Sequence, residues 1–366
     1  MSKLTRREML RLLTWAPAIV GASGLKAWGL GSNPRDPSAG RGRSVVTVVR
    51  GDDLRRMARE SLESLGGAKA FVQPGQTVFI KPNLVTAQAA AIRPVSRNGE
   101  CTKPEIVIAV AEECLKAGAA EVIVGDGAHA PRYSWKAIKT MDGTTNFAAE
   151  AERLNASYTG KVRLACLNAD SPEWVEIPTR TSIGKLAVSS LVAKADVVIS
   201  IPVLKTHTNA GLTLSMKNFI GTISNDRHGG YPVRKDIHIA GLEQSFIDVV
   251  AAFKPRLAII DASIGCEGNG PTVDPAQGKG QTVDMKERSG SWMLLASTDL
   301  VAADATAARI ISHDPAKIKQ FKVAFDQGLG QAVEDLAGGA LVVRVAEVRD
   351  DGGQVVHLLE GVEVQP

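Results

Sequence analysis

Aromatic residues are scarce in this sequence, at 4% of its 366 residues. Proteins that bind single-stranded nucleic acid stack bases on aromatic side chains, so the scarcity argues against such a partner. The body of the chain also lacks an excess of either charge. The first 30 residues carry five Lys or Arg and one Glu, which accounts for the whole net charge of +4. A basic terminus of this kind predicts no nucleic-acid partner.

Cysteine is equally sparse, with Cys101, Cys114, Cys166 and Cys266 far apart in the sequence. No CxxC pair occurs, which argues against a zinc ribbon, a thioredoxin motif and a ferredoxin-type iron–sulfur cluster. Four cysteines in an exported protein can form two disulfides. We expect free thiols instead, because Cys114 falls on the apolar face of a predicted helix.

Hydrophobic residues, at 44%, and charged residues, at 22%, are present in the proportions of a globular protein. The composition excludes a mainly disordered chain, collagen and a coiled coil. The length allows two domains or one large α/β domain with a substantial core.

The N-terminus has the features of an export signal. Arg6 and Arg7 are adjacent, and the 14 residues from Leu12 to Leu25 carry no charge and include Pro17. This run is short for a membrane span, and the arginine pair predicts a twin-arginine signal over residues 1–30. The twin-arginine translocase would then be a partner during export, and the location would be periplasmic or the cell envelope of a bacterium. A membrane anchor, if the signal is not cleaved, or a chance basic helix remains open.

The Gly-, Pro- and Arg-rich residues 31–43 predict a linker, and the folded body is expected over 44–366. Strands are predicted at 44–49, 77–81, 121–125, 162–166, 195–203 and 257–261, with late strands at 340–349 and 354–364. Helices are predicted at 52–65, 104–117, 144–154, 236–253, 299–311 and 315–327. This alternation predicts an α/β fold, with a mainly parallel or mixed sheet and helices on both faces. Two lobes around a cleft are an open alternative.

Polar side chains follow four of the predicted strands. Ligands of open α/β sheets bind beyond the carboxyl ends of the strands, so we expect one shared site there. The residues are Lys81 and Asn83, then Asp126 and His129, then Lys205 and His207, then Asp261, Glu267 and Asn269. Asp126, Asp261, Glu267 and Asn269 are expected to orient the other groups or to hold a cation.

The stretch 203–222 is the densest in such groups, since it adds Lys217 and Asn218. If a helix begins within 211–222, its first N–H groups could bind an anion. Lysine can also act as a nucleophile when its pKa is lowered. The alternative is a surface helix with a solvated lysine. Asp304, which lies among alanines, would need a partner.

His228 and His238 lie in a turn-rich loop, NDRHGGYPVRKDIH, which is a candidate lid. Both are weak candidates for metal ligands, because their spacing from His207 matches no compact metal motif.

Five motifs, in order, resemble the family called domain of unknown function 362. They are IKPNLV, TKPEIVIAVAEECLKAGAAEVIVGDGA, ADVVISIPVLKTHTNAGLTLSMKNFIGTI, IIDASIGCEGNGP and LLASTDLVAADATAAR, and the likeness covers residues 45–335. Many members carry an added ferredoxin-like cysteine cluster, which this chain lacks. The resemblance implies an α/β body of unassigned biochemistry.

A further likeness links PGQTVFI and GDGAHAPR to the N-terminal half of nickel-dependent lactate racemase. That likeness implies a catalytic role for His129, and for Lys217 the position of the lysine that carries a nickel-pincer cofactor. His207, Ala210 and Gly211 fit the racemase run before that lysine, but Ser215-Met216 replaces its Gly-Gly pair. His228 or His238 would have to serve as the nickel-binding histidine.

These observations support an exported enzyme that performs acid/base chemistry on a small carboxylate or phosphate. His129 and His207 would exchange protons. Lys81, Asn83, Lys205, Lys217 and Asn218 would bind the anion or a cofactor. The alternative is a non-catalytic protein that binds an anion or a cofactor for an exported redox system.

Overall fold

The computed structural model describes residues 44–330, 341–348 and 355–364. The predicted signal over 1–30 and linker over 31–43 lie outside these residues. No helix in the described ranges is long and apolar enough to span a membrane.

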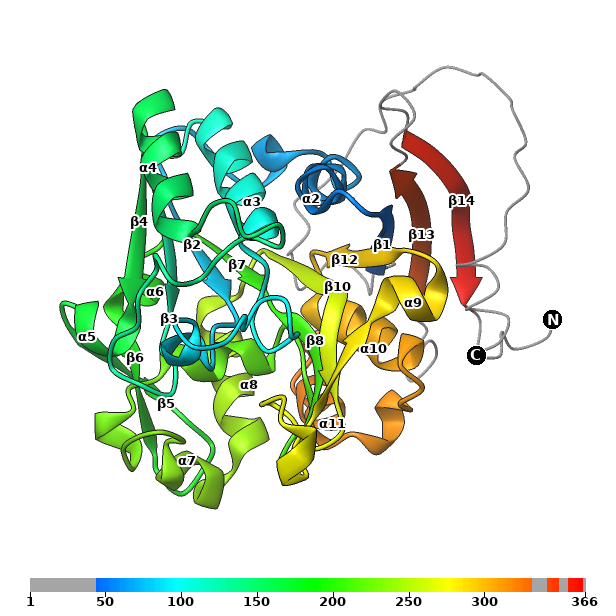
Figure 1. The fold of residues 1–366 in the computed structure, drawn as a ribbon. Helices are drawn as coiled ribbons and strands as arrows, with labels where there is room; N and C mark the ends of the chain where they lie inside the picture. The colour runs from blue at the N-terminus through cyan, green and yellow to red at the C-terminus, as the bar shows by residue number, and fades with distance from the viewer. Residues whose placement is uncertain (1–43, 331–340, 349–354, 365–366) are drawn as a thin grey trace.

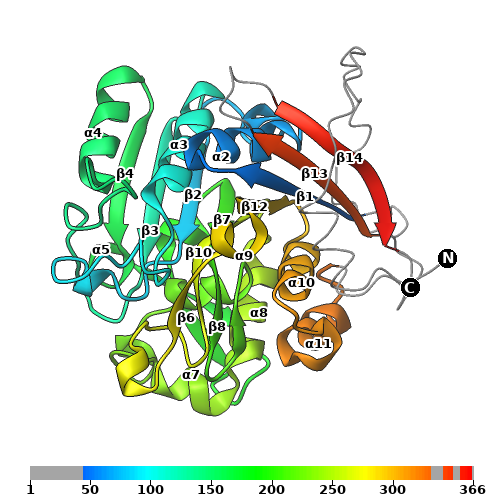
Figure 2. The same cartoon turned by 45° about the vertical axis from the view of Figure 1, so that its right-hand side comes forward.

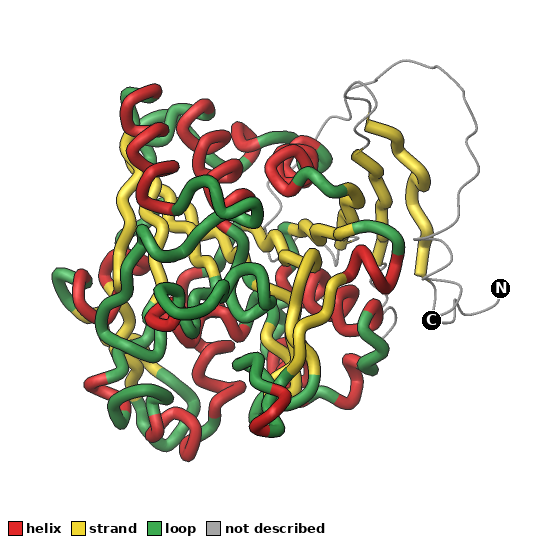
Figure 3. Tube along the Cα trace, in the orientation of Figure 1, coloured by secondary structure: helices red, strands yellow, loops and turns green. Residues whose placement is uncertain are grey.

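A single mixed sheet of 12 strands runs through the described chain (Figures 1 and 3). The strands are β1 (Ser44–Gly51), β2 (Thr77–Pro82), β3 (Glu121–Asp126), β4 (Lys161–Cys166), β7 (Val197–Ile201), β8 (Val203–His207), β9 (Gly211–Thr213), β10 (Leu257–Glu267), β11 (Gln281–Asp284), β12 (Trp292–Ser297), β13 (Leu341–Val348) and β14 (Val355–Val364). The main order is β14-β13-β1-β12-β10-β7-β2-β3-β4, with β8 and β11 paired to β10 and β9 paired to β8. Strands β5 (Trp174–Pro178) and β6 (Lys185–Ser189) form a separate hairpin sheet.

The central part of the sheet is parallel, as predicted. Strands β10, β7, β2, β3 and β4 pair in parallel along this order. Strand β12 was not predicted, and it lies between β1 and β10, antiparallel to both. Its sequence WMLLAS consists mainly of good helix formers rather than β-branched residues. Its strand conformation therefore comes from its two neighbours and not from local propensity.

Helices cover both faces of the sheet (Figure 2). They are α2 (Leu54–Glu63), α3 (Pro104–Lys116), α4 (Phe147–Ser157), α5 (Leu167–Asp170), α6 (Ser190–Ala193), α7 (Lys235–Ala240), α8 (Leu242–Phe253), α9 (Met285–Ser289), α10 (Leu300–Ile310) and α11 (Lys319–Asp326). Val78 and Ile80 of β2 belong to the core under α2, α3 and α4, whereas Phe79 belongs to the core under α8, α10 and α11. This alternation is the period-2 geometry of a strand. The two cores thus lie on opposite faces of one sheet.

Three predicted elements divide or shorten in the structure. The predicted strand 195–203 separates into β7 and β8 at Pro202, which has no N–H to donate to the sheet. The predicted helix 236–253 separates into α7 and α8 at Gly241, whose φ of 139° is outside the helical region. The predicted helix 315–327 is a 3-10 turn, η6 (Pro315–Lys317), followed by α11.

All four cysteines are buried and free, as predicted. The largest difference from the sequence-based boundaries is in β10, which continues six residues beyond Asp261. Asp261 is therefore in the middle of a strand, fully buried, and forms an ion pair with buried Lys103 at 3.1 Å. Its other oxygen accepts a hydrogen bond from the Ser263 hydroxyl at 2.5 Å.

We expect Asp261→Ala to lower the free energy of unfolding by about 3–5 kcal/mol, because it leaves the buried Lys103 ammonium without a carboxylate, bonded only to the Ile264 carbonyl. Urea unfolding followed by circular dichroism measures this loss. Glu176→Ala is the matched control. It removes an exposed ion pair with Lys185 (2.9 Å) and should not change the free energy of unfolding measurably. Equal effects of the two substitutions would contradict a structural role for the buried pair.

Candidate functional site

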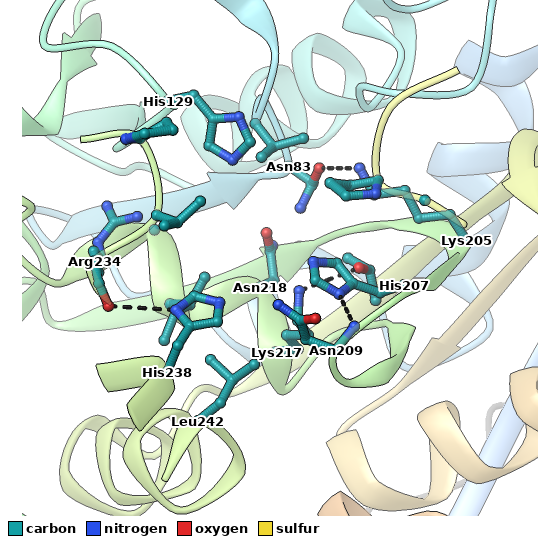
Figure 4. Close-up of a pocket in the computed structure, with 18 of the residues that line it drawn as sticks. Asn83, His129, Lys205, His207, Asn209, Lys217, Asn218, Arg234, His238 and Leu242 are labelled. Carbon is teal, nitrogen blue, oxygen red and sulfur yellow. Dashed lines mark hydrogen bonds between the residues drawn. The ribbon is translucent and has the colours of Figure 1, made fainter. Parts of the chain in front are cut away.

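A cavity of about 240 Å³ lies at the carboxyl ends of the central parallel strands. We call it the strand-end pocket. Predicted site residues that line it are Asn83, Asp126, His129, Lys205, His207, Lys217, Asn218 and His238. Figure 4 shows His129 and Arg234 on one side of this space and Lys205 and His207 on the other. One site shared by all four strand-end segments was expected. Predicted side chains of three of them line this pocket, whereas Asp261, Glu267 and Asn269 of the fourth do not.

The β8–β9 hairpin places several of these groups on one face. Lys205 and His207 are two residues apart in β8, so their side chains point to the same side. Thr213 of β9 lies directly opposite Lys205 in the antiparallel register. The Lys205 ammonium donates to Asn83 Oδ1 at 2.8 Å and to the Glu100 carbonyl at 2.6 Å.

Lys81 was expected to bind an anion or a cofactor, but it does not line the pocket. It is fully buried behind the pocket, and its ammonium forms an ion pair with Asp126 at 2.5 Å. The other Asp126 oxygen accepts from the Leu84 N–H at 2.6 Å, and the His129 N–H donates to the Val85 carbonyl at 3.0 Å. Lys81 therefore ties the loop after β2 to the loop after β3, and its charge is already compensated.

Asn218 and Gly221 close the back of this arrangement. The Asn218 amide donates to the Lys81 carbonyl at 2.6 Å and accepts from the Lys81 ammonium at 3.3 Å. A Cβ at Gly221 would lie 2.0 Å from Asp126 Oδ1, so a side chain at that position would push the segment off the ion pair.

The segment 211–222 does not begin a helix in the predicted way. It consists of β9 and a short 3-10 turn, η3 (Lys217–Thr222). The N–H groups of Ser215 and Met216 are not free to bind an anion, because they donate to the Asp304 carboxylate at 2.8 and 3.0 Å. The Ser215 hydroxyl also donates to it, at 2.5 Å. Asp304 of α10, a buried acid among alanines, thus has Ser215 and Met216 as its hydrogen-bond partners. These bonds fix the backbone just before Lys217.

Two of the buried lysines in the described chain have no carboxylate partner. Lys81 and Lys103 each form an ion pair, with Asp126 and Asp261. Lys205 is held only by neutral acceptors, and Lys217 only by the Thr213 hydroxyl at 3.4 Å. Both unpaired lysines are buried and line the pocket.

The pocket depresses the pKa values of its bases. Burial lowers the pKa of Lys205 to about 8, against smaller opposing effects from Cys101 and Cys266. Burial and the nearby Lys205 lower the pKa of Lys217 to about 7.

The two histidines respond in the same direction. Burial, reinforced by nearby cations, lowers the pKa of His129 to about 4 and that of His207 to about 2. Both are therefore neutral near pH 7, which differs from the expectation that they titrate there. His207 Nδ1 accepts from the Asn209 N–H at 3.1 Å, which leaves the ring proton on Nε2.

Arg234 is the functional-site residue that the sequence reasoning missed. It is buried, lines the pocket, and donates to the carbonyls of Ile223 and Gly127 at 2.7 and 3.0 Å. Burial lowers its pKa to about 10, so it stays charged. The predicted lid contains it, but nothing in that sequence distinguishes it from Arg227, seven residues earlier. Its backbone is left-handed, with φ of 47°.

Besides Lys81, four predicted residues lie away from the pocket lining. Asp261 is within β10, as described above. Glu267 is bonded to Arg288 and Gln281. The Asn269 amide donates to the Gly278 carbonyl at 3.0 Å. His228 is buried, and its Nε2 accepts from the Ala187 N–H at 2.9 Å, so that nitrogen is already used.

Of the two histidines considered as metal ligands, only His238 lines the pocket. Over the described ranges, no three His, Cys, Asp or Glu side chains are placed to share one metal ion. The N–H groups of Ser215-Met216, where the racemase run has Gly-Gly, are also engaged by Asp304. The described residues therefore hold no cluster of three metal ligands, and Asp304 occupies the backbone where the racemase run differs.

The family to which this chain belongs follows from comparison with known proteins. The family described as "Domain of unknown function (DUF362)" matches residues 78–309. The chain belongs to this family. The match spans β2 to α10 and so includes every pocket-lining residue named above. It confirms the resemblance seen in the five sequence motifs.

One curated relative and two solved structures are similar to this DUF362 chain. The thylakoid-associated protein sll1697 of Synechocystis sp. is 29% identical over 285 residues, which cover 76% of each chain. The lactate racemase apoprotein of Thermoanaerobacterium thermosaccharolyticum is 13% identical, with a TM-score of 0.38 over 78% of this chain. A Thermotoga maritima protein from a structural genomics consortium is 10% identical, with a TM-score of 0.39 over 76% of it. The chain spans about three fifths of the length of these two structures, at 61% and 60%.

The Asp304 carboxyl should make stability depend on pH. Burial raises its pKa to about 7, so the folded state holds a proton that the unfolded carboxyl releases near pH 4. The stabilisation from that proton is complete below pH 4 and is lost as pH rises to about 7.

We therefore expect the difference in unfolding free energy between wild type and Asp304→Asn to fall over this pH window. Urea titrations at several pH values measure it, and subtracting the variant removes the opposing contribution of the histidines. A difference that does not change between pH 4 and pH 7 would refute the raised pKa.

Proposed function

We propose that the chain binds a small carboxylate or phosphate anion in the strand-end pocket and transfers protons to or from it. The observation that carries the proposal is the pair of buried lysines, Lys205 and Lys217, which face the cavity without a carboxylate partner. A buried ammonium without a partner is costly, so such a group either loses its proton or receives an anion.

The rest of the lining is consistent with an anionic ligand. Arg234 adds a cationic group that stays charged, and the charge of Asp126 is neutralised by Lys81. The side chains of Asn83 and Asn218 add amide groups. Val85, Ile220 and Leu242 form an apolar part of the wall, which suits a short carbon chain.

The size of the cavity limits the ligand. Drug-sized ligands occupy pockets of roughly 300–1,000 Å³, and this one holds about 240 Å³. A small acid fits this volume, whereas a dinucleotide does not.

The proton-transfer part of the proposal rests on His129 and His207. Burial, reinforced by nearby cations, keeps both neutral, so His129 could accept a proton from a bound acid. His207, whose Nδ1 already accepts from Asn209, offers its Nε2–H as a donor. A bound anion would offset those cations and raise the pKa of both imidazoles. The site would therefore become more basic when it is occupied.

Lys205→Met should weaken the binding of inorganic phosphate and malonate by at least about tenfold, since it removes a charged hydrogen-bond donor. Isothermal titration calorimetry on the wild type and the variant measures this. Lys185→Met is the control, because Lys185 is exposed on β6 and bonded to Glu176.

If neither anion binds the wild-type chain, or if both variants bind as well as wild type, the anion site is refuted. If His129→Ala and His207→Gln abolish anion affinity along with Lys205→Met, the pocket acts as a carrier site. An enzyme should keep most of its ligand affinity after those histidine substitutions.

We also propose that the chain is exported, on the grounds of Arg6, Arg7 and the uncharged run that follows them. Changing both arginines to lysine should keep the protein in the cytoplasm of its host. Fractionation followed by immunoblotting measures the distribution. Equal periplasmic amounts of the wild type and the double variant would contradict twin-arginine export.

A further inference from the structure

Lys217 differs from the other three buried lysines of the described chain in what its nitrogen contacts. Lys81 and Lys103 have carboxylate partners, and Lys205 donates to two oxygens at 2.8 Å or less. The Lys217 nitrogen has one contact, to the Thr213 hydroxyl, at 3.4 Å. Its amine is thus the least engaged of the four and faces the strand-end pocket.

The groups around Lys217 favour its neutral form. Lys205 and Arg234 are the nearby cations that lower the pKa of Lys217. The acid that opposes them is Glu243, which already forms an ion pair with Lys319 at 3.0 Å. The other titratable groups of the lining are Asp126, which is paired with Lys81, and His129, His207 and His238, which are neutral at pH 7. An amine that is desolvated beside other cations is the usual form of a nucleophilic lysine.

The backbone of Lys217 is held firmly. Asp304 binds the N–H groups of the two preceding residues, and the Asn218 amide that follows is bonded to Lys81. Reaction of an amine with a bound carbonyl requires such fixed placement, because the reacting atoms must meet at close range.

We propose that Lys217 forms an imine with the carbonyl carbon of a small 2-oxo acid bound in the strand-end pocket. This rests on the proposed function, because the carboxylate of that acid would be held by Lys205, whose ammonium is already oriented by Asn83.

The step balances without an oxidant or reductant. The neutral Lys217 nitrogen bonds to the carbonyl carbon, and the carbonyl oxygen takes up one proton from solvent. The nitrogen then gives one of its protons to that oxygen, directly or through a neighbour, and water leaves. The product is a C=N bond that carries one positive charge and one proton on nitrogen.

Thr213 and His207 are placed to serve this step. The Thr213 hydroxyl contacts the amine and can relay its proton, and the Nε2–H of His207 is available as a donor in the same pocket. Asn209 keeps His207 in that tautomer, so His207 acts here as a neutral hydrogen-bond donor.

The test uses the full chain, pyruvate and sodium cyanoborohydride, which reduces an imine to a stable amine. Peptide mass mapping should place one major adduct at Lys217, and Lys217→Arg should remove it. Lys185→Arg is the matched control on an exposed lysine and should leave the adduct unchanged. The wild-type map decides the question even if Lys217→Arg fails to fold.

The pH dependence gives a second measurement. Trapping at Lys217 should rise to a plateau as pH passes about 7, whereas trapping at exposed lysines should keep rising up to about pH 10. A Lys217 adduct with the profile of exposed lysines would overturn the proposal.

Competition with inorganic phosphate separates this inference from the proposed function. Trapping at Lys217 that phosphate suppresses supports both. If phosphate binds the chain but no adduct forms at Lys217, the imine is refuted and the anion site stands. If phosphate does not bind and an adduct forms at no buried lysine, both are refuted.

Discussion

Burial of lysine ammonium groups is the constraint on which the rest of this structure depends. A sheet covered on both faces excludes water from its interior, so each cation placed there needs a partner. The chain meets this need in two ways: carboxylates compensate Lys81 and Lys103, whereas Lys205 and Lys217 face a cavity. Lys81 and Lys103 stabilise the sheet and its loops through their ion pairs, whereas Lys205 and Lys217 remain available to bind an anion.

Framework and site are connected through the Lys81–Asp126 ion pair. It joins the loops after β2 and β3, and the amide of Asn218 packs on the same lysine. The proposed chemistry therefore depends on groups that do not themselves reach a ligand. Arg234, from the far side of the pocket, is bonded to the Gly127 carbonyl next to Asp126. Segments distant in sequence thus converge on one ion pair.

Much of this arrangement could be predicted from the sequence, for reasons that the structure makes plain. Buried parallel strands are continuous apolar runs, so β2, β3 and β7 and the polar residues that follow them were recognisable. Asp261 was predicted to end its strand, because the small residues after it are typical of a loop. Pairing with β11 instead extends the strand to Glu267. Strand β12 and Arg234 depend on tertiary contacts and backbone conformation, which local sequence does not encode.

The link between Asp304 and the residues before Lys217 extends the pocket into the core of the protein. Asp304 belongs to α10, whose Ala303, Ala305 and Ala307 are fully buried against the sheet. A larger side chain at any of these alanines would shift the helix, since packed interiors absorb extra volume by moving their neighbours. The position of Lys217 in the pocket thus depends on how α10 packs. A substitution in α10, at a residue that contacts no ligand, can therefore abolish the reactivity of the pocket while the protein remains folded.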